Sequence, residues 1–167
     1  MIVSAMMAAL AIVLPMAFHA VGLGNKFLPM LLPLLLNGYL STLPWAILTA
    51  IIAPWLSAAL TGMPPIYPPV ALVMSCEGVV LAGVASTLYR TTCRRIWPAL
   101  ICAIVLSRAT SFALTWYFAS IFHLPCVVSA TAALAEGLPG VALQVIVIPI
   151  VMRGLQQRKG LLFDDEN

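Results

Sequence analysis

Long apolar runs separated by short polar or proline-rich breaks dominate the sequence. Glycine, proline and charged residues mark the ends of each run, as expected where helices stop and loops begin. A membrane-spanning helix needs ~20 mostly apolar residues, because ~1.5 Å of rise per residue must cover ~30 Å of hydrocarbon. The pattern predicts six spans, at residues 2–21, 29–43, 45–62, 70–89, 98–122 and 130–152.

The second run is the shortest, at 15 residues, and Pro33 interrupts it. We therefore expect a tilted, broken or re-entrant segment there. Broken backbone at membrane depth is tolerated only where protein or a water-filled cavity covers it. The third and fourth runs are joined by residues 63–69, whose four prolines predict a stiff extended loop.

The composition supports a membrane protein and excludes several other classes. Hydrophobic residues make up 63% of the 167 residues and charged residues 8%, whereas soluble domains carry about 25% charged residues. So little charge excludes a soluble enzyme, and the high hydrophobicity excludes a disordered chain. Four cysteines do not suggest a disulfide scaffold, and a scattered net charge of +3 does not suit nucleic-acid binding. The expected fold is an all-α integral membrane protein with six transmembrane helices in one bundle at residues 1–153, followed by a polar cytoplasmic tail at 154–167.

The basic residues predict the orientation of this bundle. Cytoplasmic loops of membrane proteins carry an excess of Lys and Arg. Six of the eight basic residues lie between the fourth and fifth spans or after the last one, so both termini are expected in the cytoplasm. These residues are Arg90, Arg94, Arg95, Arg153, Arg158 and Lys159.

Three ionisable side chains fall inside the apolar spans, namely Glu77, Arg108 and Glu136. Placing a charge at this depth costs at least ~2.5 kcal/mol of insertion free energy, so each residue is expected to have an ion-pair partner or a functional role. In one interpretation Arg108 forms a structural strut with Glu77 or Glu136, because a buried guanidinium is best tolerated in a bidentate pair. In the other, the three groups line a cavity in the outer half of the bundle and bind a polar solute. Pairing one carboxylate with Arg108 leaves the other needing a proton, a water molecule or a ligand.

Four further residues are candidates for the same site, namely Asn37, Gln144, His19 and Tyr67. Gln144 lies about two turns from Glu136 on approximately the same helix face. Tyr67 in the proline loop could stack on a planar ligand, although most aromatic residues near span ends belong to the interfacial belt. The other three could equally hydrogen-bond neighbouring helices.

Catalytic and metal-binding motifs are missing from the sequence. It has no Gly-x-x-x-x-Gly-Lys-Ser/Thr phosphate loop, and therefore no usual means of hydrolysing ATP. It also lacks a Gly-x-Ser-x-Gly elbow, a His-Glu-x-x-His zinc motif and a CxxC pair. The sequence thus predicts neither an enzyme nor a resident metal or cofactor.

Six segments in order along the chain form a recognisable pattern. They are Leu10-Ala11-Ile12-Val13-Leu14-Pro15 with Phe18-His19, Phe27-Leu28-Pro29-Met30 with Pro33, Leu60-Thr61-Gly62-Met63-Pro64-Pro65, Glu77, Arg108, and Gly137-Leu138-Pro139-Gly140-Val141-Ala142-Leu143-Gln144 running to Ile148-Pro149. Together they cover nearly the whole chain and resemble the substrate-binding S component of energy-coupling factor (ECF) vitamin transporters.

The resemblance implies a six-helix bundle that binds a vitamin or related micronutrient in a cavity at its outer face. It also implies a complex, in the bacterial cell membrane, with a transmembrane coupling protein and two cytoplasmic ATPase subunits. The family's alanine motif, which contacts the coupling protein, maps to Ala5 and Ala9. The chain departs from the family pattern at Leu31, where many relatives have histidine, and at Asn37, where alanine is common. The resemblance therefore does not identify the substrate.

Three functional hypotheses follow. The leading one is solute capture for ATP-driven import by partner subunits, with Arg108 binding an anionic or carbonyl-rich group. Such a role favours a carboxylated vitamin, for example pantothenate or a folate, over an uncharged ring, but the preference disappears if Glu77 neutralises Arg108. The second is an autonomous proton-coupled carrier that uses Glu77 or Glu136 as its proton site. The third is an assembly subunit whose charges only hold helices together.

Overall fold

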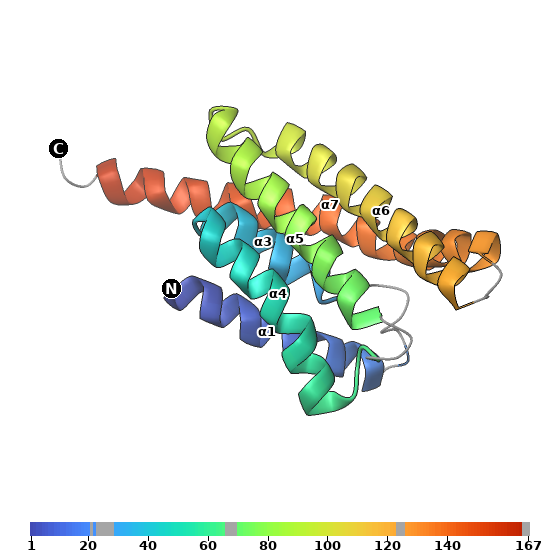
Figure 1. Ribbon diagram of the computed structural model, residues 1–167. Coiled ribbons are helices and arrows are strands. Elements are labelled where there is room, and N and C mark those ends of the chain that lie inside the picture. Colours follow the sequence, from blue (N-terminus) through green and yellow to red (C-terminus); the bar gives the residue numbers. More distant parts are fainter. Residues whose placement is uncertain (21, 23–28, 66–69, 123–125, 165–167) are drawn as a thin grey trace.

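Helices account for all the regular structure in the part of the chain that the structure describes. The computed structural model describes residues 1–20, 22, 29–65, 70–122 and 126–164, with the side chains of these residues except those of 19–20, 126–130, 132–134, 136 and 158–164. The helices are α1 (Ile2–Ala20), α3 (Leu31–Leu40), α4 (Leu43–Thr61), α5 (Val70–Thr91), α6 (Ile96–Ile121) and α7 (Cys126–Asp164), as Figure 1 shows.

Four of the helices are long and apolar enough to cross a membrane. They are α4, α5, α6 and the Gly137–Gln157 part of α7, while α1 and α3 contribute shorter apolar helices. The predicted all-helical fold with membrane-spanning helices is therefore confirmed. The count of six spans and the placement of both termini in the cytoplasm stay predictions.

The second apolar run differs from the others, because its helix α3 has only 10 residues. Ten helical residues rise about 15 Å, which is about half the thickness of the hydrocarbon layer. Pro33 lies in the first turn of α3, where its missing N–H breaks no hydrogen bond of the helix. The proline therefore helps to begin a short helix, where the sequence suggested an interruption of a longer one.

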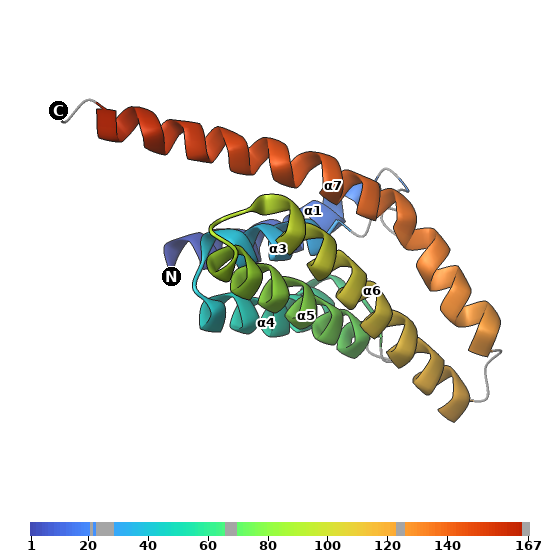
Figure 2. The same ribbon diagram turned by 90° about the horizontal axis from the view of Figure 1, so that it is seen from above.

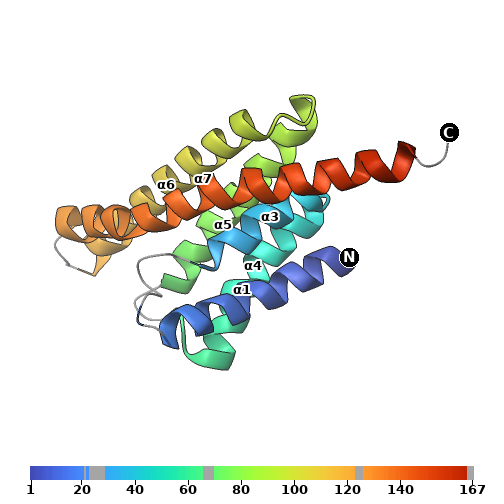
Figure 3. The same cartoon turned by 180° about the vertical axis from the view of Figure 1, so that it is seen from behind.

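Protein encloses α3 on all sides. It contacts α1, α4, α5 and α7, and every residue from Leu31 to Tyr39 is buried. Figure 3 shows α3 between α1 and α7 when the bundle is seen from behind. This is the arrangement that a bilayer tolerates for a helix too short to span it, because no backbone end faces lipid.

Small residues allow the helices around α5 to approach one another closely. α5 contacts α3, α4 and α6, which lie beside it in Figures 1 and 2. Lipid provides no hydrophobic drive for helix association, so close packing of small side chains has to supply the attraction. The fully buried alanines of these helices are Ala46, Ala50 and Ala53 in α4, Ala71, Ala82 and Ala85 in α5, and Ala99 and Ala103 in α6.

The closest approach is between α3 and α5 at Gly38. A Cβ at this position would lie 2.6 Å from the carbonyl oxygen of Ala82 and 3.1 Å from its Cα. Both atoms belong to the backbone of α5, so a larger residue could be accommodated only by moving a helix. Gly38 therefore sets the spacing between the enclosed helix and its neighbour.

α7 is the longest helix and extends past the rest of the bundle. Figure 2 shows a bend along it, and Pro139 and Pro149 lie inside the helix. A proline within a helix removes a hydrogen bond and commonly causes such a bend. The helix continues to Asp164, so most of the segment expected as a polar tail prolongs α7. Both chain ends lie at the end of the bundle where α5 turns into α6 (Figure 1).

Replacing Gly38 with alanine is expected to destabilise the bundle, because the new Cβ would press on the α5 backbone. Overpacking of this kind costs about 1–3 kcal/mol. The midpoint of thermal unfolding in detergent should fall by about 4 °C or more.

Gly83→Ala is the matched control, because the nearest atom to its added Cβ is Leu43 Cδ1 at 4.0 Å. Alanine favours a helix over glycine by about 1 kcal/mol, so this variant should unfold at the same or a higher temperature. Equal midpoints for the two variants would contradict the close contact at Gly38.

Candidate functional site

An ion pair joins α5 to α6 inside the bundle. Arg108 Nη2 donates a hydrogen bond to Glu77 Oε1. The Glu77 side chain is 4% exposed and the Arg108 side chain 15%, so Glu77 is covered while the Arg108 side chain keeps a small accessible surface. Of the two carboxylates proposed from the sequence as partners of Arg108, the structure pairs it with Glu77.

The packing of α5 directs Glu77 towards α6. The next residue, Gly78, faces the opposite neighbours, and a Cβ there would lie 3.0 Å from Leu34 Cδ1 and 3.5 Å from the Ala50 Cβ. This side of α5 is therefore filled by α3 and α4. Glu77 lies on the adjoining side, where Arg108, near the middle of α6, reaches it.

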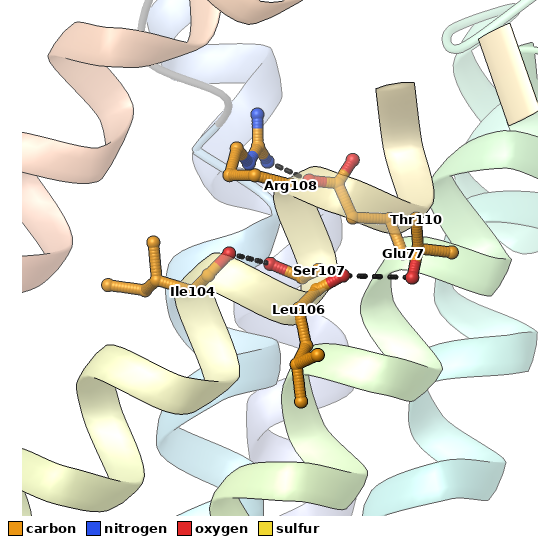
Figure 4. A network of polar contacts seen from close by, with 6 residues as sticks. All are labelled: Glu77, Ile104, Leu106, Ser107, Arg108 and Thr110. Carbon is orange, nitrogen blue, oxygen red and sulfur yellow. Dashed lines mark hydrogen bonds and ion pairs between the residues drawn. The ribbon is translucent and has the colours of Figure 1, made fainter. Parts of the chain in front are cut away.

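The hydroxyl groups next to Arg108 in α6 form no hydrogen bond with its guanidinium. Ser107 Oγ donates to the carbonyl of Ile104 at 2.9 Å, and Thr110 Oγ1 donates to that of Leu106 at 2.9 Å, so both bond within α6 (Figure 4). Figure 4 also shows one guanidinium nitrogen pointing away from Glu77. A guanidinium has five N–H donors, and within the described residues Arg108 uses its side chain only towards Glu77. Arg108 can therefore accept a further partner, such as a solute oxygen.

Gln144 lies on the inward-facing side of α7. The buried positions Gly137, Gly140, Gln144 and Ile148 recur every three or four residues and form one stripe along this helix. Gln144 is 3% exposed, and within the described part of the chain its amide forms no hydrogen bond. The buried side-chain nitrogen and oxygen atoms without a partner among the described residues are limited to Asn37 Nδ2, so the Gln144 amide is not a fully buried, unsatisfied group.

Asn37 belongs to a separate chain of hydrogen bonds that links α3 to α1. Its Oδ1 accepts from Ser41 Oγ at 2.6 Å, and Ser41 Oγ accepts from Ser4 Oγ at 2.8 Å. Asn37 is fully buried, and its Nδ2 has no partner among the described residues. It shares no hydrogen bond with the ion pair. The Gly38 contact with Ala82 places it about one turn further along α5 than Glu77.

Three of the predicted site residues cannot be located. The side chains of His19 and Glu136, and all of Tyr67, lie outside the described residues. Their role at the site stays a prediction.

Ala5 and Ala9 lie on an open face of α1. Both are exposed, and a separation of four residues puts them on one side of the helix. α1 contacts α3 and α4, and large apolar side chains such as Met6, Val13 and Met16 are 62%, 58% and 52% exposed on it. The predicted partner motif is thus accessible to lipid or to another protein.

The sequence did not indicate a second polar cluster, near the turn between α5 and α6. Arg90 Nη2 donates to the carbonyl of Ser41, Tyr39 OH donates to the carbonyl of Ile96 at 3.1 Å, and Gln156 Nε2 donates to Tyr89 OH at 3.0 Å. From the sequence, Arg90 was used only to predict which side of the bundle faces the cytoplasm. The available signal was its spacing of four residues from Ser86, which it contacts through Nε at 3.4 Å.

No group of three or more metal-ligating His, Cys, Asp or Glu side chains occurs among the described residues. The candidate site is therefore built from one ion pair and buried amides, which bind through hydrogen bonds and charge.

Comparison with protein families decides what kind of molecule this is. The family described as ECF transporter, substrate-specific component, matches residues 1–152. The chain belongs to this family. No curated protein and no solved structure matches the chain. The resemblance drawn from the sequence is therefore confirmed at the level of the family.

Membership in the family shows in which kind of protein the ion pair and the bundle occur. An ECF substrate-specific component is a substrate-binding membrane subunit of a transporter and not an enzyme, and it works with the partners of an ECF module. Together with its four membrane-capable helices, this identifies the component as a multi-pass membrane protein.

Breaking the ion pair from one side is expected to destabilise the component more than neutralising it from both. Glu77→Gln leaves the guanidinium without its counter-charge in a poorly solvated place, which costs about 3 kcal/mol. In Glu77→Gln with Arg108→Gln, two neutral amides remain that can hydrogen-bond each other. Thermal unfolding in detergent should give a midpoint for the double variant above that of Glu77→Gln.

The double-mutant cycle made from these variants and Arg108→Gln measures the coupling of the two residues. Strictly additive losses of stability would mean that the two side chains do not stabilise each other.

Proposed function

We propose that this ECF substrate-specific component captures a vitamin or related micronutrient at the outer face of its bundle and delivers it to partner subunits that drive uptake with ATP. The observation that carries the proposal is that Arg108 is paired with Glu77 but is not completely buried. Its guanidinium is neutralised by Glu77, yet the Arg108 side chain is 15% exposed and several of its N–H donors have no partner among the described residues. A charge held in this way is positioned to bind an acceptor oxygen that enters from water.

The buried amides near the ion pair support a binding role. Gln144 offers an amide with no described partner on the inner side of α7, and α7 packs against α6, which carries Arg108. A site that hydrogen-bonds a solute through buried amides rejects analogues that lack the matching group, because its own polar atoms are then left unpaired. Glu136, Asn37, His19 and Tyr67 complete the proposed set of contacts.

The need for partners follows from the chemistry of the chain. It contains no phosphate-binding loop for ATP, so energy for uphill uptake has to come from other subunits. We propose a transmembrane coupling protein and two cytoplasmic ATPases in this role, with the coupling protein seated on Ala5 and Ala9 of α1. The excess of basic residues at the end that carries the termini supports a cytoplasmic location for that end in a bacterial cell membrane.

The first experiment identifies the solute. The component is extracted in detergent, and mass spectrometry of the small molecules that it releases on denaturation names the compound. We expect a compound that presents acceptor oxygens, because Arg108 supplies N–H donors to such atoms; its pairing with Glu77 removes the preference for a carboxylate. Its affinity is then measured by isothermal calorimetry.

Arg108 is expected to contribute to solute affinity independently of its contribution to folding. The folded double variant with Gln at positions 77 and 108 should bind the identified compound about tenfold or more weakly, because hydrogen bonds to a charged group are lost. Arg153→Gln is the control, since Arg153 is exposed and is not part of the ion pair, and its affinity should equal that of the unaltered protein. Full affinity in a folded double variant would leave Arg108 with a structural role alone.

A transport assay separates the proposal from an autonomous carrier. Vesicles that contain the component alone should accumulate no solute under a pH gradient, whereas vesicles that also contain the partner subunits should accumulate it with ATP. Uptake by the component alone under a pH gradient would overturn the proposal in favour of proton coupling.

A further inference from the structure

A pocket of about 300 Å³ lies at the end of the bundle that carries the termini. It is remote from the ion pair, because Tyr89 in its wall follows Glu77 by about 18 Å along α5. Its volume is at the lower end of the range of small-molecule sites, about 300–1,000 Å³. Its polar lining residues are Tyr39, Thr42, Tyr89, Arg90, Arg94 and Gln156.

Two arginines of this pocket have no negative partner in the described protein. None of the lining residues is acidic, and the ion pairs between described residues are limited to the one at Arg108. Arg90 and Arg94 therefore bring two positive charges to one small space. Such a space attracts an anion.

Arg90 is held in place by groups that carry no charge. Its Nη2 donates to the carbonyl of Ser41, and its Nε contacts Ser86 Oγ at 3.4 Å. These bonds fix the guanidinium and leave Nη1 without a partner among the described residues. A donor that is already fixed loses little conformational entropy when a ligand binds.

The backbone around Arg94 has an unusual conformation. Cys93 and Arg94 have φ angles of 48° and 59°, in the left-handed region that residues other than glycine rarely adopt. The N–H of Arg94 bonds back to the carbonyl of Tyr89 at 3.0 Å. This turn ends α5 and keeps Arg94 beside Tyr89 in the pocket wall.

The polar groups that remain available in the pocket are mainly donors. Tyr89 OH accepts from Gln156 Nε2 at 3.0 Å, so its own proton is free for another acceptor. Two guanidinium groups and one hydroxyl proton suit an anion with several oxygens. Guanidinium groups match the geometry of phosphate oxygens, which they bind through paired hydrogen bonds.

We propose that this pocket binds a phosphate group, supplied by the headgroup of an anionic phospholipid. Leu40, Met152 and Leu155 form the apolar part of the wall, which a lipid would cover and a free phosphate would leave unused. The protein spans the membrane several times, and the basic end of the bundle lies where headgroups are found. Basic pockets between transmembrane helices bind anionic headgroups in this way.

Native mass spectrometry of the detergent-purified protein tests the proposal. The probes are phosphatidylglycerol and phosphatidylcholine with the same acyl chains. The unaltered protein should bind phosphatidylglycerol in preference to phosphatidylcholine. Arg94→Gln should weaken phosphatidylglycerol binding about fivefold, the effect of one arginine near an anionic lipid surface.

Arg95→Gln is the matched control, because Arg95 is exposed and adjacent but does not line the pocket. It makes the same change in net charge and should leave lipid binding unchanged. Equal weakening in both variants would reveal general attraction between charges and overturn the proposal. Equal binding of the two lipids by the unaltered protein would overturn it as well.

Inorganic phosphate distinguishes the source of the anion. If phosphate raises the unfolding temperature of the unaltered protein but not of Arg94→Gln, while phosphatidylglycerol binds no better than phosphatidylcholine, the pocket is a phosphate site and the lipid assignment is overturned. If neither probe binds and Arg94→Gln instead weakens assembly with partner subunits, the pocket is a protein contact and the proposal fails.

Discussion

The ion pair between Arg108 and Glu77 is the interaction on which the centre of this bundle depends. A lone charge at bilayer depth would cost at least ~2.5 kcal/mol, and the pair offsets part of that cost by placing opposite charges together in a poorly solvated space. Complete burial would leave such a pair with a structural role only. Here the Glu77 side chain is covered and the Arg108 side chain is partly accessible, so the arrangement joins α5 to α6 without burying Arg108 completely.

The burial of α3 within the bundle has a related cause, because the membrane interior offers no water to hydrogen-bond polar groups. Its ten residues cannot span the hydrocarbon layer, so its backbone ends and Asn37 have to find partners within the protein. Ser41 donates a hydrogen bond to Asn37 Oδ1 and accepts one from Ser4 of α1, and Gly38 lets α5 come near enough to cover the helix. Small residues thus allow close packing around α3, while the serine hydroxyl groups provide hydrogen bonds for the Asn37 carbonyl oxygen that this packing buries.

The sequence predicted those features that depend on local pattern. Apolar runs of sufficient length identified the membrane-spanning helices, and the cost of buried charge led to the pairing of Arg108 with a glutamate. Features that depend on neighbours distant in the sequence were harder to predict. Nothing near Pro33 indicates that four other helices surround α3. Nor can sequence spacing reveal that Ser41, the partner of Asn37, accepts a hydrogen bond from Ser4 of α1. Arg90 and Arg94 were interpreted only through their location, because a pocket requires α3, α5 and α7 to be placed together.

The concentration of exposed arginines at one end of the bundle limits how the protein can move in the membrane. Arg90, Arg94, Arg95 and Arg153 all lie at that end and are exposed, and carrying each through the hydrocarbon would cost about 2.5–3.5 kcal/mol or more. Thermal motion does not supply that energy for several charges at once. Any reorientation of the bundle would therefore keep the basic end at the level of the headgroups, and the opposite end would move further.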